Sequence, residues 1–146
     1  MTDSSQQILS ALGRCVGRDH SEARSMPPAF YTSSEFCDLE KTSLFREQWI
    51  GLGRADQIPK PGDYFTVDLV GEPLIVVRGQ DSQINILSNV CRHRGSLIAE
   101  GAGTAKNFIC PYHAWSYATD GKLLRAPLIA ERSDFDAENC RLPRFA

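Results

Sequence analysis

Two short pairs of cysteine and histidine place the tightest constraint on how this chain can fold. Cys91 and His93 are separated by one residue, and Cys110 and His113 are separated by two. The sequence holds three histidines in total, so two of the three lie close to a cysteine. Sixteen residues lie between His93 and Cys110, which is enough for a hairpin that brings the two segments side by side. A chain that uses these four side chains together must present two loops at one end of a rigid scaffold.

The segment that carries both pairs has the pattern of a small antiparallel β domain. Short runs rich in β-branched and aromatic residues alternate with turn residues, and there is no alternation of strands with helices. The expected strands are 64–70, 74–78, 84–90, 107–109, 115–118 and 122–125. The breaks at 79–82 and 119–121 are typical of hairpin turns. We therefore predict an all-β, antiparallel, sandwich-like domain in which each Cys/His pair follows a strand.

The part of the chain before this β domain is expected to be helical. Ser33 or Ser34 can cap a helix whose apolar residues recur at helical spacing until the glycine at position 51. Residues 1–28 are expected to form a weakly ordered or helical extension, because their apolar stripe is short and interrupted by glycine. The domain proper is expected to cover residues 29–146.

Composition argues against several functional classes. The 16 Lys and Arg residues are balanced by 18 Asp and Glu, whereas a nucleic-acid-binding domain usually has a basic face. No run approaches about 20 apolar residues, and the N-terminus lacks the basic and apolar regions of a secretory signal. Five cysteines, an odd number, do not suggest a disulfide framework. We therefore expect a cytoplasmic protein that binds neither nucleic acid nor membranes and whose paired cysteines serve metal binding or catalysis.

Three kinds of site could use the paired side chains. Structural zinc sites of Cys₂His₂ type usually group the two cysteines before the two histidines, whereas this chain alternates them. A Cys–His nucleophilic pair needs only one cysteine, and no motif for an oxyanion hole accompanies it. In a [2Fe–2S] cluster of Rieske type, two cysteines hold one iron and two histidines hold the other. The alternation favours this third site, because each loop then gives one ligand to each iron. The predicted ligands are Cys91, His93, Cys110 and His113.

The residues around these ligands resemble a known protein family. The segments Cys91-Arg-His-Arg-Gly95 and Cys110-Pro-Tyr-His-Ala-Trp115 are similar to the N-terminal Rieske domain of the large (alpha) subunit of Rieske non-haem iron oxygenases. That family includes ring-hydroxylating and quaternary-amine-oxidising enzymes. The similarity extends from about Phe30 to Phe145. It implies a Rieske fold with a cluster-binding subdomain of two loops, preceded by an N-terminal helix.

The resemblance also implies an electron-transfer function. In that family a Rieske-type [2Fe–2S] cluster passes electrons from a reductase or ferredoxin to a mononuclear iron, which is held by two histidines and a carboxylate. With His93 and His113 assigned to the cluster, only His20 remains, so the C-terminal catalytic domain is expected to be absent from this chain. The chain would then be an oxidoreductase component that is catalytically incomplete by itself.

The same resemblance suggests the partners. They are a reductase or ferredoxin as electron donor and a catalytic oxygenase domain or subunit as electron acceptor, a homotrimer being one candidate assembly of the full-length protein. The alternative function is that of a free-standing Rieske ferredoxin-like electron carrier.

Overall fold

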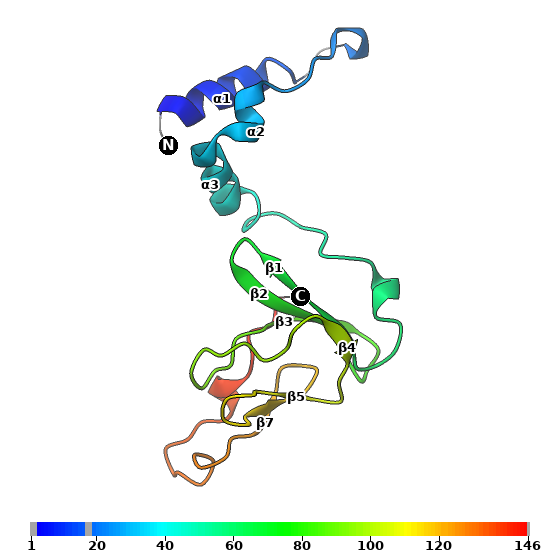
Figure 1. Cartoon of the computed structure of the whole chain (residues 1–146), viewed down its shortest axis with the longest axis vertical. Helices are drawn as coiled ribbons and strands as arrows, with labels where there is room; N and C mark the ends of the chain where they lie inside the picture. Colours follow the sequence, from blue (N-terminus) through cyan, green and yellow to red (C-terminus); the bar gives the residue numbers. More distant parts are fainter. Residues whose placement is uncertain (1–2, 17–18, 146) are drawn as a thin grey trace. The chain divides into compact units, whose positions relative to one another are not determined.

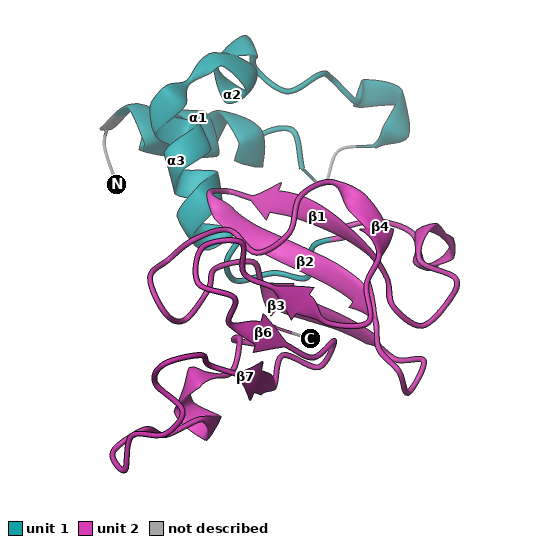
Figure 2. Cartoon of the chain, turned by 60° about the horizontal axis from the view of Figure 1, so that its bottom comes forward, with its two compact units in different colours: residues 1–50 teal, residues 51–146 magenta. Residues whose placement is uncertain are grey.

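The computed structural model describes residues 3–16 and 19–145, and the chain divides into two compact units, Met1–Ile50 and Gly51–Ala146 (Figure 2). The described part of the first unit contains helices, and the described part of the second contains β-strands and short 3₁₀ helices. Within the described ranges, no helix has the length and apolar character needed to cross a membrane. The expected boundary between residues 28 and 29 stays a prediction about domain organisation.

The helical unit contains α1 (Asp3–Gly13), α2 (Pro28–Thr32) and α3 (Ser34–Ser43), together with a 3₁₀ helix at His20–Glu22. Helix α3 begins where the sequence predicts, because the Ser33 hydroxyl accepts a hydrogen bond from the Phe36 N–H at 3.1 Å. It ends at Ser43, earlier than its apolar spacing indicates. The hydroxyls of Thr42 and Ser43 donate to the Leu39 carbonyl at 3.0 and 2.5 Å, and such bonds compete with the helical ladder.

The second unit is built from two antiparallel sheets, as the sequence predicts (Figure 1). The four-stranded sheet has the order β3-β2-β1-β4 and the three-stranded sheet the order β5-β6-β7. Their bounds are β1 Asp63–Leu69, β2 Glu72–Arg78, β3 Ile84–Ser88, β4 Ala102–Thr104, β5 Phe108–Ile109, β6 Ser116–Tyr117 and β7 Leu123–Arg125. Two 3₁₀ helices, Ala55–Gln57 and Glu138–Cys140, complete the unit. Strand β4 was not expected, since its small residues show no strand pattern.

The core of the second unit includes side chains from both sheets. Ile75 and Val77 of β2 and Leu87 of β3 are completely buried in the same cluster as Tyr117 of β6. Tyr117 pairs in register with Phe108 of β5, which belongs to the same cluster. Burial of these apolar side chains is the main driving force for folding such a domain. The core thus fixes β3 and β5, the two strands that precede the Cys/His pairs.

The turn between β1 and β2 contains an unfavourable backbone conformation. Leu69 pairs with Glu72, which leaves a two-residue loop, and both Val70 (φ +53°) and Gly71 (φ +86°) have positive φ. Turns of this kind favour Asn-Gly, and a β-branched residue in the left-handed region is an outlier. We expect Val70→Asn to raise the free energy of unfolding by about 1 kcal/mol, measured by urea denaturation.

Gly71→Ala is the matched control for this turn. A methyl group at Gly71 would meet nothing within 4 Å, so only the positive φ opposes it. We expect the alanine variant to lose about 1–2 kcal/mol. A Val70→Asn variant less stable than the parent would contradict the assignment of strain to Val70.

Candidate metal centre

The first Cys/His pair lies in a tight loop that closes back on its own cysteine. The Cys91 N–H donates to the Ser96 carbonyl at 2.9 Å, and the Gly95 N–H donates to the Cys91 carbonyl at 3.0 Å. Gly95 has a φ of +71°, which glycine adopts without strain. The loop therefore turns at Gly95, as the sequence predicts, and His93 lies within it.

The second pair lies in a loop with the same hydrogen bonds. The Cys110 N–H donates to the Trp115 carbonyl at 2.8 Å, and the Ala114 N–H donates to the Cys110 carbonyl at 3.0 Å. Ala114 has a φ of +59°, and it stands four residues after its cysteine as the glycine does in the first loop. One type of turn is thus used twice, although the spacing from cysteine to histidine differs between the loops.

Asn89 ties the first loop to the sheet. Its side-chain oxygen accepts from the N–H groups of Ile98 and Ala99 at 3.2 and 2.9 Å, and its side-chain nitrogen donates to the Ala99 carbonyl at 2.8 Å. Asn89 is 3% exposed, so these bonds satisfy groups that water does not reach. They close the chain on both sides of the Cys91 loop, a role that the sequence analysis missed.

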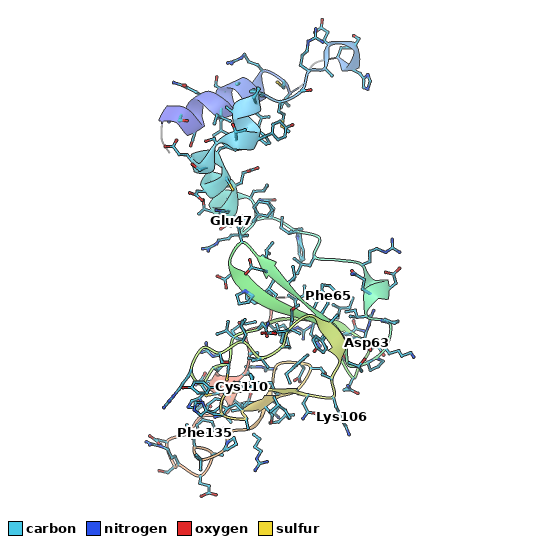
Figure 3. The ribbon with its side chains drawn as sticks, viewed as in Figure 1. Glu47, Asp63, Phe65, Lys106, Cys110 and Phe135 are labelled. Carbon is cyan, nitrogen blue, oxygen red and sulfur yellow. The ribbon has the colours of Figure 1, made fainter. Side chains whose placement is uncertain are left out.

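The two loops bring the predicted ligands together. The rings of His93 and His113 meet edge to face, with their centroids 4.7 Å apart. Both cysteines are buried, at 3% for Cys91 and 2% for Cys110, whereas both histidines are half-buried. In the view of Figure 3, Cys110 lies on one side of the second unit, away from Asp63 and Lys106. The site therefore has a buried thiol side and a partly exposed imidazole side.

Local electrostatics favour the protonation states that bind metals. Burial opposes ionisation of the Cys110 thiol, but the backbone N–H groups of Tyr112 and His113 and the side chains of Cys91 and Ser96 outweigh it and lower the pKa of Cys110. Burial, followed by repulsion from His113 and Arg94, lowers the pKa of His93. Cysteine binds metals as thiolate and histidine as neutral imidazole. Both pKa shifts therefore extend the pH range of these metal-binding forms toward lower pH.

The Tyr117 side chain forms hydrogen bonds with two residues of the first loop. Its hydroxyl oxygen lies 3.3 Å from the Cys91 sulfur and accepts from the Arg92 N–H at 3.1 Å. Burial, together with the Cys91 side chain, raises the pKa of Tyr117 far above its ordinary value. Tyr117 therefore stays a neutral hydroxyl that can donate to a Cys91 thiolate. The sequence analysis placed Tyr117 beneath the loops without recognising this contact.

We expect Tyr117→Phe to alter both stability and redox behaviour. The substitution removes the acceptor of the partly buried Arg92 N–H, which costs about 1 kcal/mol, and it removes a donor to the Cys91 sulfur. Loss of a hydrogen bond to a ligand sulfur makes the cluster harder to reduce. Thermal unfolding and voltammetry should show a lower Tm and a more negative midpoint potential.

Tyr112→Phe is the control, because Tyr112 is 60% exposed and its ring contacts His113 at a centroid distance of 3.8 Å. Tyr112→Phe should leave the Tm and the midpoint potential near those of the parent. Equal potentials for Tyr117→Phe and the parent would contradict the proposed donor role of Tyr117.

A buried, unpaired nitrogen tests whether these residues fit a metal group. Within the described residues, His113 Nδ1 is buried and has no hydrogen-bond partner, which a native protein rarely tolerates. A neutral imidazole nitrogen of this kind is a common metal ligand. No three His, Cys, Asp or Glu side chains of the described ranges gather as a single-ion site requires. Two cysteines and two histidines, one of each from either loop, are the donor set of a [2Fe–2S] cluster with mixed ligands, so the residues fit this group.

An antiparallel β domain with two matching Cys/His turns has the residue types of a metal-binding protein. Residues 48–143 match the Rieske [2Fe-2S] domain, and the chain belongs to this family. A Rieske-type [2Fe–2S] cluster is therefore the cofactor that its family implies.

The relatives found by comparison are oxygenase subunits. The chain is 41% identical over 118 residues to the carnitine monooxygenase oxygenase subunit of Acinetobacter baumannii, covering 80% of this chain and 32% of that protein. It is 42% identical over 111 residues to the benzene 1,2-dioxygenase subunit alpha of Pseudomonas putida, covering 75% of this chain and 25% of that one. The chain thus spans about a third or less of the length of these relatives.

The chain is also similar to solved structures of oxygenases. The quaternary ammonium Rieske monooxygenase CntA with a bound inhibitor has a TM-score of 0.77 at 36% identity, covering 85% of this chain and 35% of that chain. Naphthalene 1,2-dioxygenase from Rhodococcus sp. has a TM-score of 0.81 at 26% identity, covering 96% of this chain and 31% of that chain. The mostly β fold predicted from the sequence is confirmed by these likenesses and by the strands themselves.

Proposed function

We propose that Cys91, His93, Cys110 and His113 hold a Rieske-type [2Fe–2S] cluster, with the two cysteines on one iron and the two histidines on the other. When bound, the cluster supplies one-electron redox chemistry. The domain then relays electrons from a reductase or ferredoxin to a mononuclear non-haem iron in a catalytic oxygenase domain or subunit. A homotrimer is the proposed assembly of the full-length protein, and a cytoplasmic location stays a prediction.

One observation carries this proposal. Two loops with the same hydrogen-bond pattern carry two thiols and two imidazoles, and the buried His113 Nδ1 has no hydrogen-bond partner among the residues that the structure describes. A lone cysteine or histidine in a β domain is usually a packing or surface residue. Two equivalent turns, each with one cysteine and one histidine, are expected for a two-iron cluster.

The chain's own residues prepare the site for electron transfer. The pKa values of Cys110 and His93 are both lowered, which favours thiolate and neutral imidazole, the forms that bind metal. The buried core keeps water from the two cysteines, while the half-buried His93 and His113 offer a short path to a partner surface. Arg92 and Arg94, which flank His93, are exposed and suited to an acidic partner.

The relatives do not favour one substrate class. Identity to a carnitine monooxygenase subunit is 41% and to a benzene dioxygenase subunit 42%, so the domain is equally close to both. A free-standing Rieske ferredoxin-like carrier remains the second candidate, because the site described above needs no other domain to hold a cluster. Supplied with reductase, NADH, oxygen and aromatic or quaternary-amine substrates, this chain should be reduced without forming hydroxylated product, because only His20 remains for a second iron site.

We expect the chain purified without oxygen to contain about two irons and two acid-labile sulfides, as a [2Fe–2S] cluster requires. Its reduced form should give the rhombic EPR signal of a cluster with mixed histidine and cysteine ligands. Metal analysis and EPR measure both properties. Stoichiometric zinc without sulfide would refute the proposal in favour of a structural zinc site.

A further inference from the structure

Among the described residues, a second buried nitrogen in the loop of His113 also lacks a hydrogen-bond partner. In the described part of the chain, two buried side-chain nitrogen or oxygen atoms have no hydrogen-bond partner, His113 Nδ1 and Trp115 Nε1. The two residues are separated by a single position in the same loop. An unsatisfied buried donor costs about 1–3 kcal/mol, so native proteins retain one mainly where a ligand completes it. The first atom has an explanation as an iron ligand, and the second needs one.

The indole ring of Trp115 is fixed in place. Trp115 is 3% exposed, and its ring stacks on the His93 ring at a centroid distance of 4.8 Å and an interplanar angle of 8°. The ring of Phe135 meets it edge to face at 5.8 Å and 86°. The backbone carbonyl of Trp115 also closes the second loop by accepting from Cys110. The indole therefore cannot turn to find a distant partner, and water does not reach its N–H.

The acceptor is not supplied by the described residues. The Cys91 sulfur interacts with the Tyr117 hydroxyl, and neither cysteine sulfur is a partner of Trp115 Nε1. An indole N–H is a donor only, so the missing partner must be an acceptor. The cluster assigned to this site brings two inorganic sulfides, which accept hydrogen bonds from the protein.

We propose that the Trp115 indole N–H donates a hydrogen bond to an inorganic sulfide of the cluster, which makes Trp115 a positioning residue that tunes the reduction potential. This inference rests on the proposed function. An added electron increases the negative charge on the sulfides, so a donor to sulfide is bound more strongly after reduction. Trp115 therefore favours the reduced form, and its N–H should raise the midpoint potential.

The experiment removes the N–H alone. The sequence has two tryptophans, and the other, Trp49, is 97% exposed, so Trp49→Phe leaves Trp115 as the sole tryptophan of an otherwise native chain. This variant is grown with β-(3-benzothienyl)alanine, in which sulfur replaces the indole N–H while the ring size is nearly kept. We expect a more negative midpoint potential in film voltammetry than in Trp49→Phe with ordinary tryptophan. Trp49→Phe itself should match the parent.

A second measurement leaves the native side chain intact. With ¹⁵N-indole tryptophan in the Trp49→Phe chain, pulsed EPR of the reduced form should detect a weakly coupled ¹⁵N in addition to the unlabelled imidazoles. An unchanged potential with the sulfur analogue overturns the proposal. A shifted potential without ¹⁵N coupling also overturns direct donation, because the indole N–H would then lie too far from the cluster to bond to a sulfide. A parent chain that forms no cluster refutes the proposed function, and this inference with it.

Discussion

We expect His113→Ala to abolish the [2Fe–2S] cluster, with iron and sulfide falling far below two per chain. Loss of a residue that only orients a ligand weakens metal binding by about 10- to 100-fold, and loss of a ligand should exceed this. The alanine also removes the buried Nδ1 that has no other partner among the described residues. Iron and sulfide analysis, the visible spectrum and EPR of the reduced protein measure the effect.

The chain provides controls of both ligand types. His20 is exposed in the first unit, and His20→Ala should keep full cluster content. Cys37 is also exposed, and Cys37→Ala should behave likewise, whereas Cys110→Ala should lose the cluster. Full iron and sulfide content in His113→Ala would refute the assigned ligand set.

The second large effect is expected in the core. Leu87 is 0% exposed and lies in the cluster that joins the two sheets. Truncating a buried leucine to alanine costs about 2–5 kcal/mol, because apolar contact is lost and a cavity remains. For a domain of this size, 1 kcal/mol shifts Tm by about 4–8 °C, so Leu87→Ala should lower Tm by roughly 10 °C or more at a fixed scan rate.

Leu124→Ala tests whether this loss comes from burial. Leu124 is 53% exposed, and a surface substitution usually changes stability by less than about 0.5 kcal/mol. Its Tm should stay close to that of the parent. A Leu87→Ala variant with the Tm of Leu124→Ala would contradict the two-sheet core.

Patterns of hydrophobic spacing and turn residues were sufficient to predict most of the fold. Strands β2 and β3 fall where runs of β-branched residues predicted them, and Ser33 caps α3 as expected. Strand β4 escaped detection because it is held by pairing with β1, as between Phe65 and Ala102, and not by its own side chains. Helix α2 was not predicted, because its five residues are too few to show helical spacing, although Pro28 suits the first turn of a helix.

The candidate site was predictable as a set of residue types but not as a structure. The spacing of Cys91, His93, Cys110 and His113 was enough to propose the ligands, and the structure brings them together. The contacts of Tyr117 and Asn89 depend on residues far along the chain, so local patterns do not reveal them. Gly95 and Ala114 both have a positive backbone φ. An alanine in the sequence gives no sign of such a conformation, so the similarity of the two turns was not predicted.

The unequal burial of the four predicted ligands bears on how such a site is damaged. Cys91 and Cys110 are nearly inaccessible, whereas His93 and His113 are half-buried. Chelators and small oxidants therefore reach the imidazole side first, while alkylating reagents reach the thiols only after the loops open. The rate at which iodoacetamide labels Cys91 and Cys110 thus reports on opening of the two loops.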